Sequence, residues 1–143
     1  MTNIQAALGV AQLERLDEFL VRKRCIGKLY SERLKSLERL QLPLDRTDYA
    51  ENHYWVFGVV LDDSFEFDAP EAMRRLNQRG IGCRPFFCPM QMQPVLRKMG
   101  LFDGDQYPVS ERLYRRGFYI PSGLALTETQ VDDVSRVMKE LFS

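Results

Sequence analysis

The sequence predicts a small α/β fold of the α+β kind, in which a long N-terminal helix is followed by a small sheet packed with helices. Three observations support this class: apolar residues at helical spacing over the first forty positions, an aromatic and β-branched run at 53–61, and alternating strand-like and helix-like segments after it. The 143 residues are 45% hydrophobic, enough to bury one core. Because no repeat, linker or low-complexity segment divides the sequence, we expect a single domain over residues 1–143.

The first forty residues predict one long amphipathic helix. Apolar side chains recur at intervals of three and four, with charged residues such as Arg15 and Lys28 between them. We expect Thr2 or Asn3 to cap this helix and Gly27 to mark a bend. After the cap comes the run IQAALGVAQL, which is small and apolar nearly all round, as in a helix covered on most sides, so a covering partner is expected. The periodic apolar positions are Ile4, Leu8, Ala11, Leu16, Phe19, Leu20, Ile26, Tyr30, Leu34, Leu37 and Leu40.

Two strands are expected in the middle of the chain. The polar, turn-rich residues 42–52 lead into HYWVFGVVL at 53–61, whose aromatic and β-branched content predicts a largely buried strand. A second, shorter strand is expected for IGCRPFF at 81–87.

A well-delimited helix is expected between these strands, over residues 68–80. Asp68 is the expected N-cap, and Glu71, three residues later, would complete a capping box. Pro70 fits the first helical turn, where its missing N–H costs nothing. Gly80 is the expected left-handed stop.

The C-terminal part predicts two more helices around a short strand. One helix is expected over 108–116 with Gly117 ending it, and FYIPSG at 118–123 predicts a strand and a turn. The last helix is expected to start at Thr127, because TETQ is again a capping box. Its expected inner face consists of Val131, Val134, Met138, Leu141 and Phe142.

The composition argues against several classes of partner. Lys plus Arg and Asp plus Glu both number 20, so the one-sign charge excess typical of proteins that bind nucleic acid or anionic membranes is missing. No apolar run approaches the roughly 20 residues needed to cross a bilayer. The three cysteines show no metal-binding spacing and the only histidine is His53, so no metal site is expected. Free thiols without a signal peptide indicate a cytoplasmic protein.

No self-sufficient catalytic motif is present. The sequence lacks the glycine patterns that bind dinucleotides or nucleotide phosphates, the nucleophile elbow of hydrolases, and the HExxH metal motif. His53 beside Tyr54 and Trp55 is either a general base or substrate contact, or a structural residue. Cys83 and Cys88 would need a nearby base to act as nucleophiles, so both are expected to be small buried hydrophobes. We therefore assign no catalytic residue.

The stretch RPFFCPMQMQP at 84–94 has two interpretations. It is either a core strand followed by a hydrophobic loop, or one wall of a pocket that another surface completes. In the second case Arg84 would bind a phosphate or carboxylate beside an aromatic face, and Gln91 and Gln93 would add polar contacts. The residues alone leave both interpretations open.

Four separated segments of the chain resemble the C-terminal part of the DegT/DnrJ/EryC1/StrS aminotransferases, in the same order and spacing. The segments are MTNIQAALGVAQLERLDE, NHYWVFGVVL, RPFFCPMQMQP and PVSERLYRRGFYIPSGLALTETQVDDV. The resemblance implies the small C-terminal domain of a fold-type I enzyme that depends on pyridoxal phosphate (PLP). It is greatest to the branch with the perosamine synthases, which aminate a 4-keto-6-deoxy sugar carried on a nucleotide diphosphate.

The resemblance also implies that this chain lacks the PLP site. In the family, the lysine that binds PLP and most of its other contacts lie in a large N-terminal domain, so we expect a truncated chain with no bound cofactor and no activity alone. None of the five lysines stands in a setting suited to that role: Lys23, Lys28, Lys35, Lys98 and Lys139.

Roles carried over from the family fall on two regions. His53 and Tyr54, with Trp55 beside them, occupy a strand whose start approaches the sugar, while Arg84, Phe86 and Phe87 line the substrate entrance. Gln91 stands where the family usually has histidine, which leaves the substrate open. The list of expected substrate-binding residues is therefore Arg84, Phe86, Phe87, Gln91, His53 and Tyr54.

The expected partners are a nucleotide-diphosphate sugar and, through the N-terminal helix, the missing large domain or a second copy of the chain. The alternative is a stand-alone, non-catalytic module that binds a nucleotide sugar or associates with a complete aminotransferase. A third possibility is a domain in which Cys88 or His53 has been recruited for new chemistry.

Overall fold

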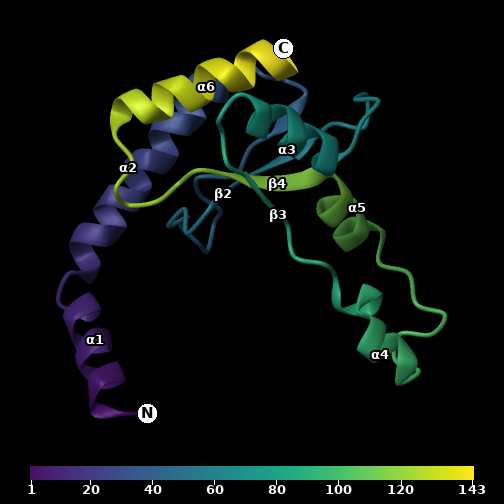
Figure 1. Ribbon diagram of the computed structural model, residues 1–143, viewed down its shortest axis with the longest axis horizontal. Coiled ribbons are helices and arrows are strands. Elements are labelled where there is room, and N and C mark those ends of the chain that lie inside the picture. Colours follow the sequence, from purple (N-terminus) through teal and green to yellow (C-terminus); the bar gives the residue numbers. More distant parts are fainter.

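The computed structural model describes residues 1–143 and centres on one four-stranded sheet (Figure 1). The strands β1 (Leu40–Gln41), β2 (Phe57–Leu61), β3 (Arg84–Pro85) and β4 (Gly117–Ile120) lie in the order β1-β2-β4-β3. Every neighbouring pair is antiparallel. The expected small sheet with helices packed on it is confirmed. The helices are α1 (Asn3–Leu13), α2 (Leu16–Leu34), α3 (Ala69–Gln78), α4 (Pro94–Lys98), α5 (Pro108–Arg116) and α6 (Glu128–Phe142), with a 3₁₀ turn, η1, at Met90–Met92.

One hydrophobic core joins the sheet to α2, α3 and α6. In Figure 1, α6 lies along the C-terminal half of α2 above the sheet. Arg33 of α2 pairs with both Glu128 and Asp132 of α6, which fixes the two helices at their surface. The inner face expected for α6 is confirmed, except that Leu141 is only half-buried. The large side chains closed off from solvent include Tyr30, Leu34, Tyr54, Phe57, Leu61, Leu76, Phe118, Met138 and Phe142.

The prediction of one continuous N-terminal helix is wrong. The chain leaves helical geometry at Arg15, where φ is −111° and ψ is 12°, and α2 ends at Leu34. Nothing packs over α1, which contains no buried residue, whereas α2 is held against α6. The expected cap is confirmed, since the Thr2 hydroxyl accepts from the Gln5 N–H and the Gln5 side chain accepts from the Thr2 N–H.

The bend expected at Gly27 stays a prediction, and the structure gives this glycine a role in packing. It lies within α2, and a Cβ placed on it would stand 2.2 Å from Cγ of Tyr54. The ring of Tyr54 therefore fills the space that Gly27 leaves. Ring packing of this kind depends on a residue far along the chain, so a local pattern cannot distinguish it from a helix bend.

The strand predicted at 53–61 begins only at Phe57. Tyr54 has φ +51°, the left-handed conformation, which an extended strand does not accommodate. The side-chain oxygen of Asn52 accepts the Tyr54 N–H at 2.7 Å and stabilises this turn. The result is a short irregular segment that turns the Tyr54 ring into the core.

The helix predicted at 68–80 is present, but its expected capping box is wrong. Asp68 makes no cap hydrogen bond, because its carboxylate accepts from Arg116. Hydrogen bonds from Arg74 and Arg75 hold Glu71 and lower its pKa to about 2. The stop at Gly80, with φ +79°, is confirmed. The capping box at Thr127 and the end of α5 at Gly117 are confirmed as well.

Residues 88–107 form a projection that the sequence did not predict in this form. The strand expected at 81–87 is reduced to Arg84–Pro85, and η1 and α4 follow it. Pro94 occupies the first position of α4, where proline is tolerated. In Figure 1 this projection and α1 both extend from the side of the sheet opposite α6. No helix of the chain combines the length and apolar character needed to cross a membrane.

A buried guanidinium connects the α5–β4 junction to the β2–α3 loop. Arg116 is only 4% exposed, and it donates to the backbone carbonyls of Asp62, Phe65 and Phe67 and to the carboxylate of Asp68. Its Nε has no hydrogen-bond acceptor, although a carboxylate oxygen of Asp63 lies 3.5 Å away. This one side chain thus satisfies several carbonyls that would otherwise lack donors.

We expect Arg116→Met to lower the free energy of unfolding by about 3–5 kcal/mol, because the substitution leaves buried carbonyls and a carboxylate without their donor. Urea unfolding followed by circular dichroism measures the change. Arg115→Met is the matched control, since Arg115 is exposed and forms no ion pair, and we expect a change within about 0.5 kcal/mol. Equal losses in the two variants would contradict the assigned role.

Candidate functional site

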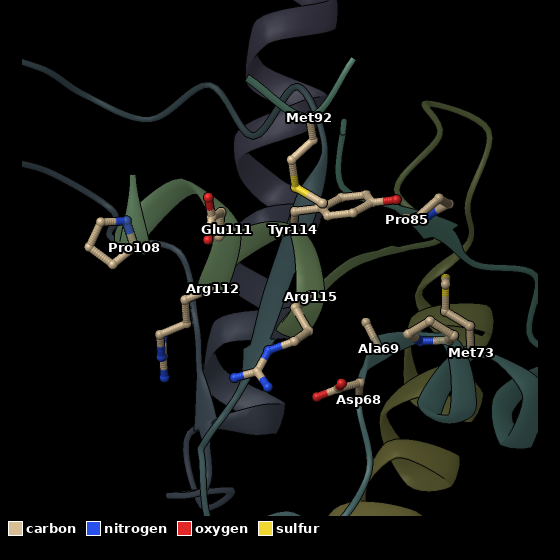
Figure 2. A pocket seen from close by; sticks show the side chains of 11 residues that line it. Asp68, Ala69, Met73, Pro85, Met92, Pro108, Glu111, Arg112, Tyr114 and Arg115 are labelled. Carbon is tan, nitrogen blue, oxygen red and sulfur yellow. The ribbon is translucent and has the colours of Figure 1, made fainter. Parts of the chain in front are cut away.

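Two neighbouring hollows open beside β3 and α5, and they share Pro85 and Tyr114. The first has a volume of about 580 Å³ and lies between the start of α3 and α5 (Figure 2). The second, of about 490 Å³, lies between the segment before β2 and the segment after β3. The second is lined by Trp55, Val56, Arg84, Pro85, Phe86, Phe87, Cys88, Tyr114 and Tyr119.

The first hollow carries charges of both signs. Figure 2 shows Arg115 and Asp68 on one side and Met92 with Tyr114 on the other. Asp68 is already paired with Arg116 at 2.9 Å. The first hollow is therefore a mixed surface whose acids and bases largely compensate one another. Its other charged lining residues are Arg112, paired with Asp63, and Glu111.

The second hollow has a rigid aromatic wall. The ring of Phe86 stacks on Tyr119 with 4.6 Å between ring centroids. It lies over Gly58 of β2 and Gly117 of β4, where an added Cβ would approach the ring to 2.9 Å and 2.5 Å. The two glycines therefore create the space that the ring fills, and they fix its position on the sheet.

Two further rings and one cation stand free at the second hollow. Trp55 is 72% exposed and Phe87 is 74% exposed. Arg84 is exposed on the edge strand β3, and its guanidinium makes no ion pair or hydrogen bond to the protein. It is the only charged residue that lines this hollow. The site therefore offers aromatic faces and an unpaired guanidinium, a combination suited to an anionic ligand with a flat ring.

The structure brings together three of the six predicted substrate residues, Arg84, Phe86 and Phe87. Gln91 lies apart from them, because its side-chain amide donates to the Ser110 hydroxyl at 2.9 Å and holds η1 against α5. Its predicted contact with substrate stays a prediction.

The remaining two predicted residues line neither hollow. His53 is exposed and its Nδ1 lies 3.1 Å from Arg24, which also pairs with Glu51. Tyr54 is 1% exposed, and its hydroxyl donates to Asp45 at 3.0 Å. Burial raises the pKa of this hydroxyl. Tyr54 thus acts as a core residue in this arrangement, and the predicted contacts of His53 and Tyr54 with substrate stay predictions.

The sequence-based list of site residues lacks Trp55, Tyr114 and Tyr119. The antiparallel register places Tyr119 opposite Gly58 on one side and Arg84 on the other, so its place in the site depends on pairing that no local pattern reveals. One signal was available: Gly58, a glycine in the middle of the strand-like run at 53–61, marks a close approach of another group.

The side chains at the two hollows do not suit a metal ion or PLP. No group of three His, Cys, Asp or Glu residues could hold a metal ion. A PLP site would need a lysine facing a cavity, yet no lysine lines either hollow. Lys28 is exposed and borders only a surface depression formed by α2 residues. Lys23 donates to the Ser122 carbonyl at 2.6 Å, and burial lowers its pKa. The residues present do not fit PLP, and the expected absence of bound cofactor stays a prediction.

The thiols differ in their surroundings. Cys25 is exposed, whereas Cys83 and Cys88 are half-buried. Burial raises the pKa of the Cys83 thiol to about 11, and its Sγ lies 3.6 Å from the Ile81 carbonyl oxygen, to which it donates. Since the thiolate is the nucleophilic form, Cys83 is poorly suited to nucleophilic chemistry.

Known proteins resemble the chain over its whole length. The model of the DegT/DnrJ/EryC1/StrS aminotransferase family matches residues 1–139. GDP-perosamine synthases of Vibrio cholerae and Escherichia coli O157:H7 are each 32% identical over all of this chain, which covers 38% and 37% of their own lengths. The solved structure of Helicobacter pylori PseC, an aminotransferase involved in the biosynthesis of pseudoaminic acid, superposes with a TM-score of 0.85 at 17% identity. That match covers 97% of this chain and 37% of PseC. The chain thus spans a little over a third of the length of these relatives.

We expect Gly58→Ala to displace the Phe86 ring and to lower the free energy of unfolding by about 1–3 kcal/mol, because the new methyl group enters occupied space. Urea unfolding measures the stability, and the ring-current shifts of Tyr119 report the position of Phe86. Gly82→Ala is the control, since nothing lies within 4 Å of its added Cβ, and it should leave both measurements unchanged. An unmoved Tyr119 spectrum in Gly58→Ala would contradict the packing described.

The raised pKa of Cys83 predicts how the reactivity of its thiol depends on pH and on folding. Because the folded pKa of about 11 lies above the roughly 8.5 of a free thiol, the neutral thiol stabilises the fold fully below pH 8.5. This contribution is lost as the pH rises towards 11. At pH 8 we expect iodoacetamide to alkylate Cys83 about 100-fold more slowly in the folded chain than in urea, as measured by peptide mass spectrometry. Equal rates in the two states would show that burial does not suppress the thiolate.

Proposed function

The chain belongs to the DegT/DnrJ/EryC1/StrS aminotransferase family, and on that premise we propose that residues 1–143 form the small C-terminal domain of a PLP-dependent nucleotide-sugar aminotransferase. The family depends on PLP. The observation that carries the proposal is the second hollow, where the unpaired Arg84 stands among aromatic faces. A nucleotide sugar has both anionic phosphates and flat ring surfaces, so it matches this wall.

In this proposal the domain positions the sugar nucleotide, and the reaction takes place on residues outside this chain. The guanidinium of Arg84 binds anionic oxygens of the substrate. Phe86 keeps the floor of the hollow in place, since it is fixed over Gly58 and Gly117. No residue of this chain is assigned a catalytic role, because no lysine lines either of the two hollows.

The exposed face of α1 is proposed as the contact with the rest of the enzyme, either a large PLP-binding domain or a second subunit. This helix has no buried residue, and its apolar side chains would be solvated if nothing covered them. We place the domain in the cytoplasm, where its three free thiols would stay reduced. The exposed apolar residues of α1 are Ile4, Leu8, Val10 and Leu13, and Leu16 and Val21 lie exposed on the first turns of α2.

The second candidate function is a non-catalytic module that binds a nucleotide sugar without any transamination. One observation favours it: the side chains that line the two hollows do not fit PLP, because no lysine is among them. The two functions differ in whether this domain can complete a working active site.

A chimeric enzyme tests the proposal. The part of the Vibrio cholerae GDP-perosamine synthase that precedes the matched segment is joined to residues 1–143. We expect the chimera, supplied with PLP, glutamate and a GDP-linked 4-keto-6-deoxy sugar, to form the amino sugar, and the chain alone to form none. Product is measured by chromatography and mass spectrometry. A chimera that folds and binds PLP without turnover, while residues 1–143 bind the nucleotide sugar, supports the non-catalytic module instead.

Arg84→Met in the same chimera provides the residue-level test. Because a hydrogen bond to a charged group contributes about 1.5–3 kcal/mol, we expect kcat/KM to fall by roughly 10- to 150-fold. Arg115→Met removes the same charge from the neighbouring hollow and should leave kcat/KM within about twofold. The assignment of Arg84 fails if both variants lose activity equally or neither does.

A further inference from the structure

We propose that Trp55 and Phe87 bind the flat base of the nucleotide, and that Arg84 binds its phosphate. This inference rests on the proposed function, because it names the part of the sugar nucleotide that this domain recognises. The ligand class is a nucleoside phosphate, and the site is the second hollow, whose volume of about 490 Å³ is within the usual range for small-molecule sites.

The two rings are exposed although the fold has fixed them in place. Trp55 directly follows Tyr54, whose ring is buried against Gly27 and whose hydroxyl is bonded to Asp45. Phe87 directly follows Phe86, whose ring is stacked on Tyr119. In each pair the first residue anchors the backbone and the second presents its ring to the hollow.

Neither exposed ring has a satisfactory partner within the chain. Trp55 forms no ring pair and its indole N–H makes no hydrogen bond, and it is 72% exposed. Phe87 has a single ring contact, with Tyr119 at 6.4 Å between ring centroids, and its side chain stays 74% exposed. Large aromatic side chains gain most when both faces are covered, so two anchored and uncovered rings beside one hollow indicate a flat ligand.

The charge of the second hollow indicates that the ligand also carries a phosphate. Arg84 is the only charged residue among the nine that line it, so no carboxylate opposes an anion there. The first hollow differs in this respect, since Asp68 and Glu111 line it together with Arg112 and Arg115. Because aromatic rings make up much of the lining, we expect stacking to dominate, with purines binding more tightly than pyrimidines.

The chain contains one tryptophan, Trp55, so tryptophan fluorescence reports directly on the proposed contact. We expect GMP to quench the fluorescence of Trp55 in the 143-residue chain in a saturable manner. Guanosine, which lacks the phosphate, should bind at least about 10-fold more weakly than GMP. Ribose 5-phosphate, which lacks the base, should cause no quenching. Absence of saturable binding of GMP overturns the proposal, and so does ribose 5-phosphate binding as tightly as GMP.

Substitutions of single residues test which side chains contact GMP. Because loss of a stacking aromatic costs about 1–3 kcal/mol, Phe87→Ala should raise the Kd for GMP by about 5- to 150-fold. Trp55→Ala should do the same by calorimetry, while Trp55→Phe should keep most of the affinity. Arg84→Met should weaken GMP binding, and Arg115→Met should leave the Kd within about twofold. Binding that depends on Arg115 and not on Arg84 would place the ligand in the first hollow and overturn the assignment.

The same substitutions in the chimeric enzyme separate this inference from the proposed function. If both hold, Phe87→Ala raises KM for the nucleotide sugar with little change in kcat. If the chimera turns over the nucleotide sugar and KM is unchanged in Phe87→Ala and Trp55→Ala, the base site is wrong and the proposed function stands. If GMP binds residues 1–143 as described but the folded chimera is inactive, the base site stands and the aminotransferase proposal fails.

Discussion

The guanidinium of Arg116, closed off from water between α5, β4 and the β2–α3 loop, determines where the sheet can lie. It donates to the carbonyls of Asp62, Phe65 and Phe67, so the loop cannot move without exposing them. Gly117 begins β4 immediately after Arg116, and β4 pairs with β2 on one side and β3 on the other. The position of β3, and with it the start of the aromatic wall, therefore follows from one buried charge. Burial of a guanidinium is costly unless its donors are paired, and here three backbone carbonyls and one carboxylate pair all but Nε.

A second set of side chains, all from α2, holds the segment after β4. The hydroxyl of Tyr30 donates to the Pro121 carbonyl at 2.8 Å, Lys23 donates to Ser122, and Arg22 donates to Leu124 and Leu126. Burial raises the pKa of Tyr30, so this donor stays protonated. The body of the fold is thus fixed on both flanks of β4. In contrast, α1 and the projection at 88–107 extend away from this body with many apolar side chains in solvent, and regions with so little burial open most easily.

Local rules in the sequence predicted the parts of the fold that depend on neighbouring residues. The capping box at Thr127 and the stops at Gly80 and Gly117 follow from contacts within one turn. The predicted capping box at Asp68 failed because of a residue distant in sequence. Arg116, 48 positions away, donates to the Asp68 carboxylate, which therefore does not cap α3. The site divides in the same way. Arg84, Phe86 and Phe87 are neighbours in sequence and were found, whereas Tyr114 and Tyr119 join them only through helix packing and strand register.

The residues that hold the fold together differ from those that form the exposed surface of the second hollow. Phe86 fills space that exists only because positions 58 and 117 are glycine, so neither the ring nor the glycines can change without loss of packing. Phe87 and Trp55 make few contacts within the chain, so their replacement alters the surface of the hollow and leaves the core intact. Arg84 belongs to the second kind, because its guanidinium satisfies no group of the fold. The surface of the second hollow can therefore change through a few exposed positions while the sheet, the buried arginine and the helix contacts stay the same.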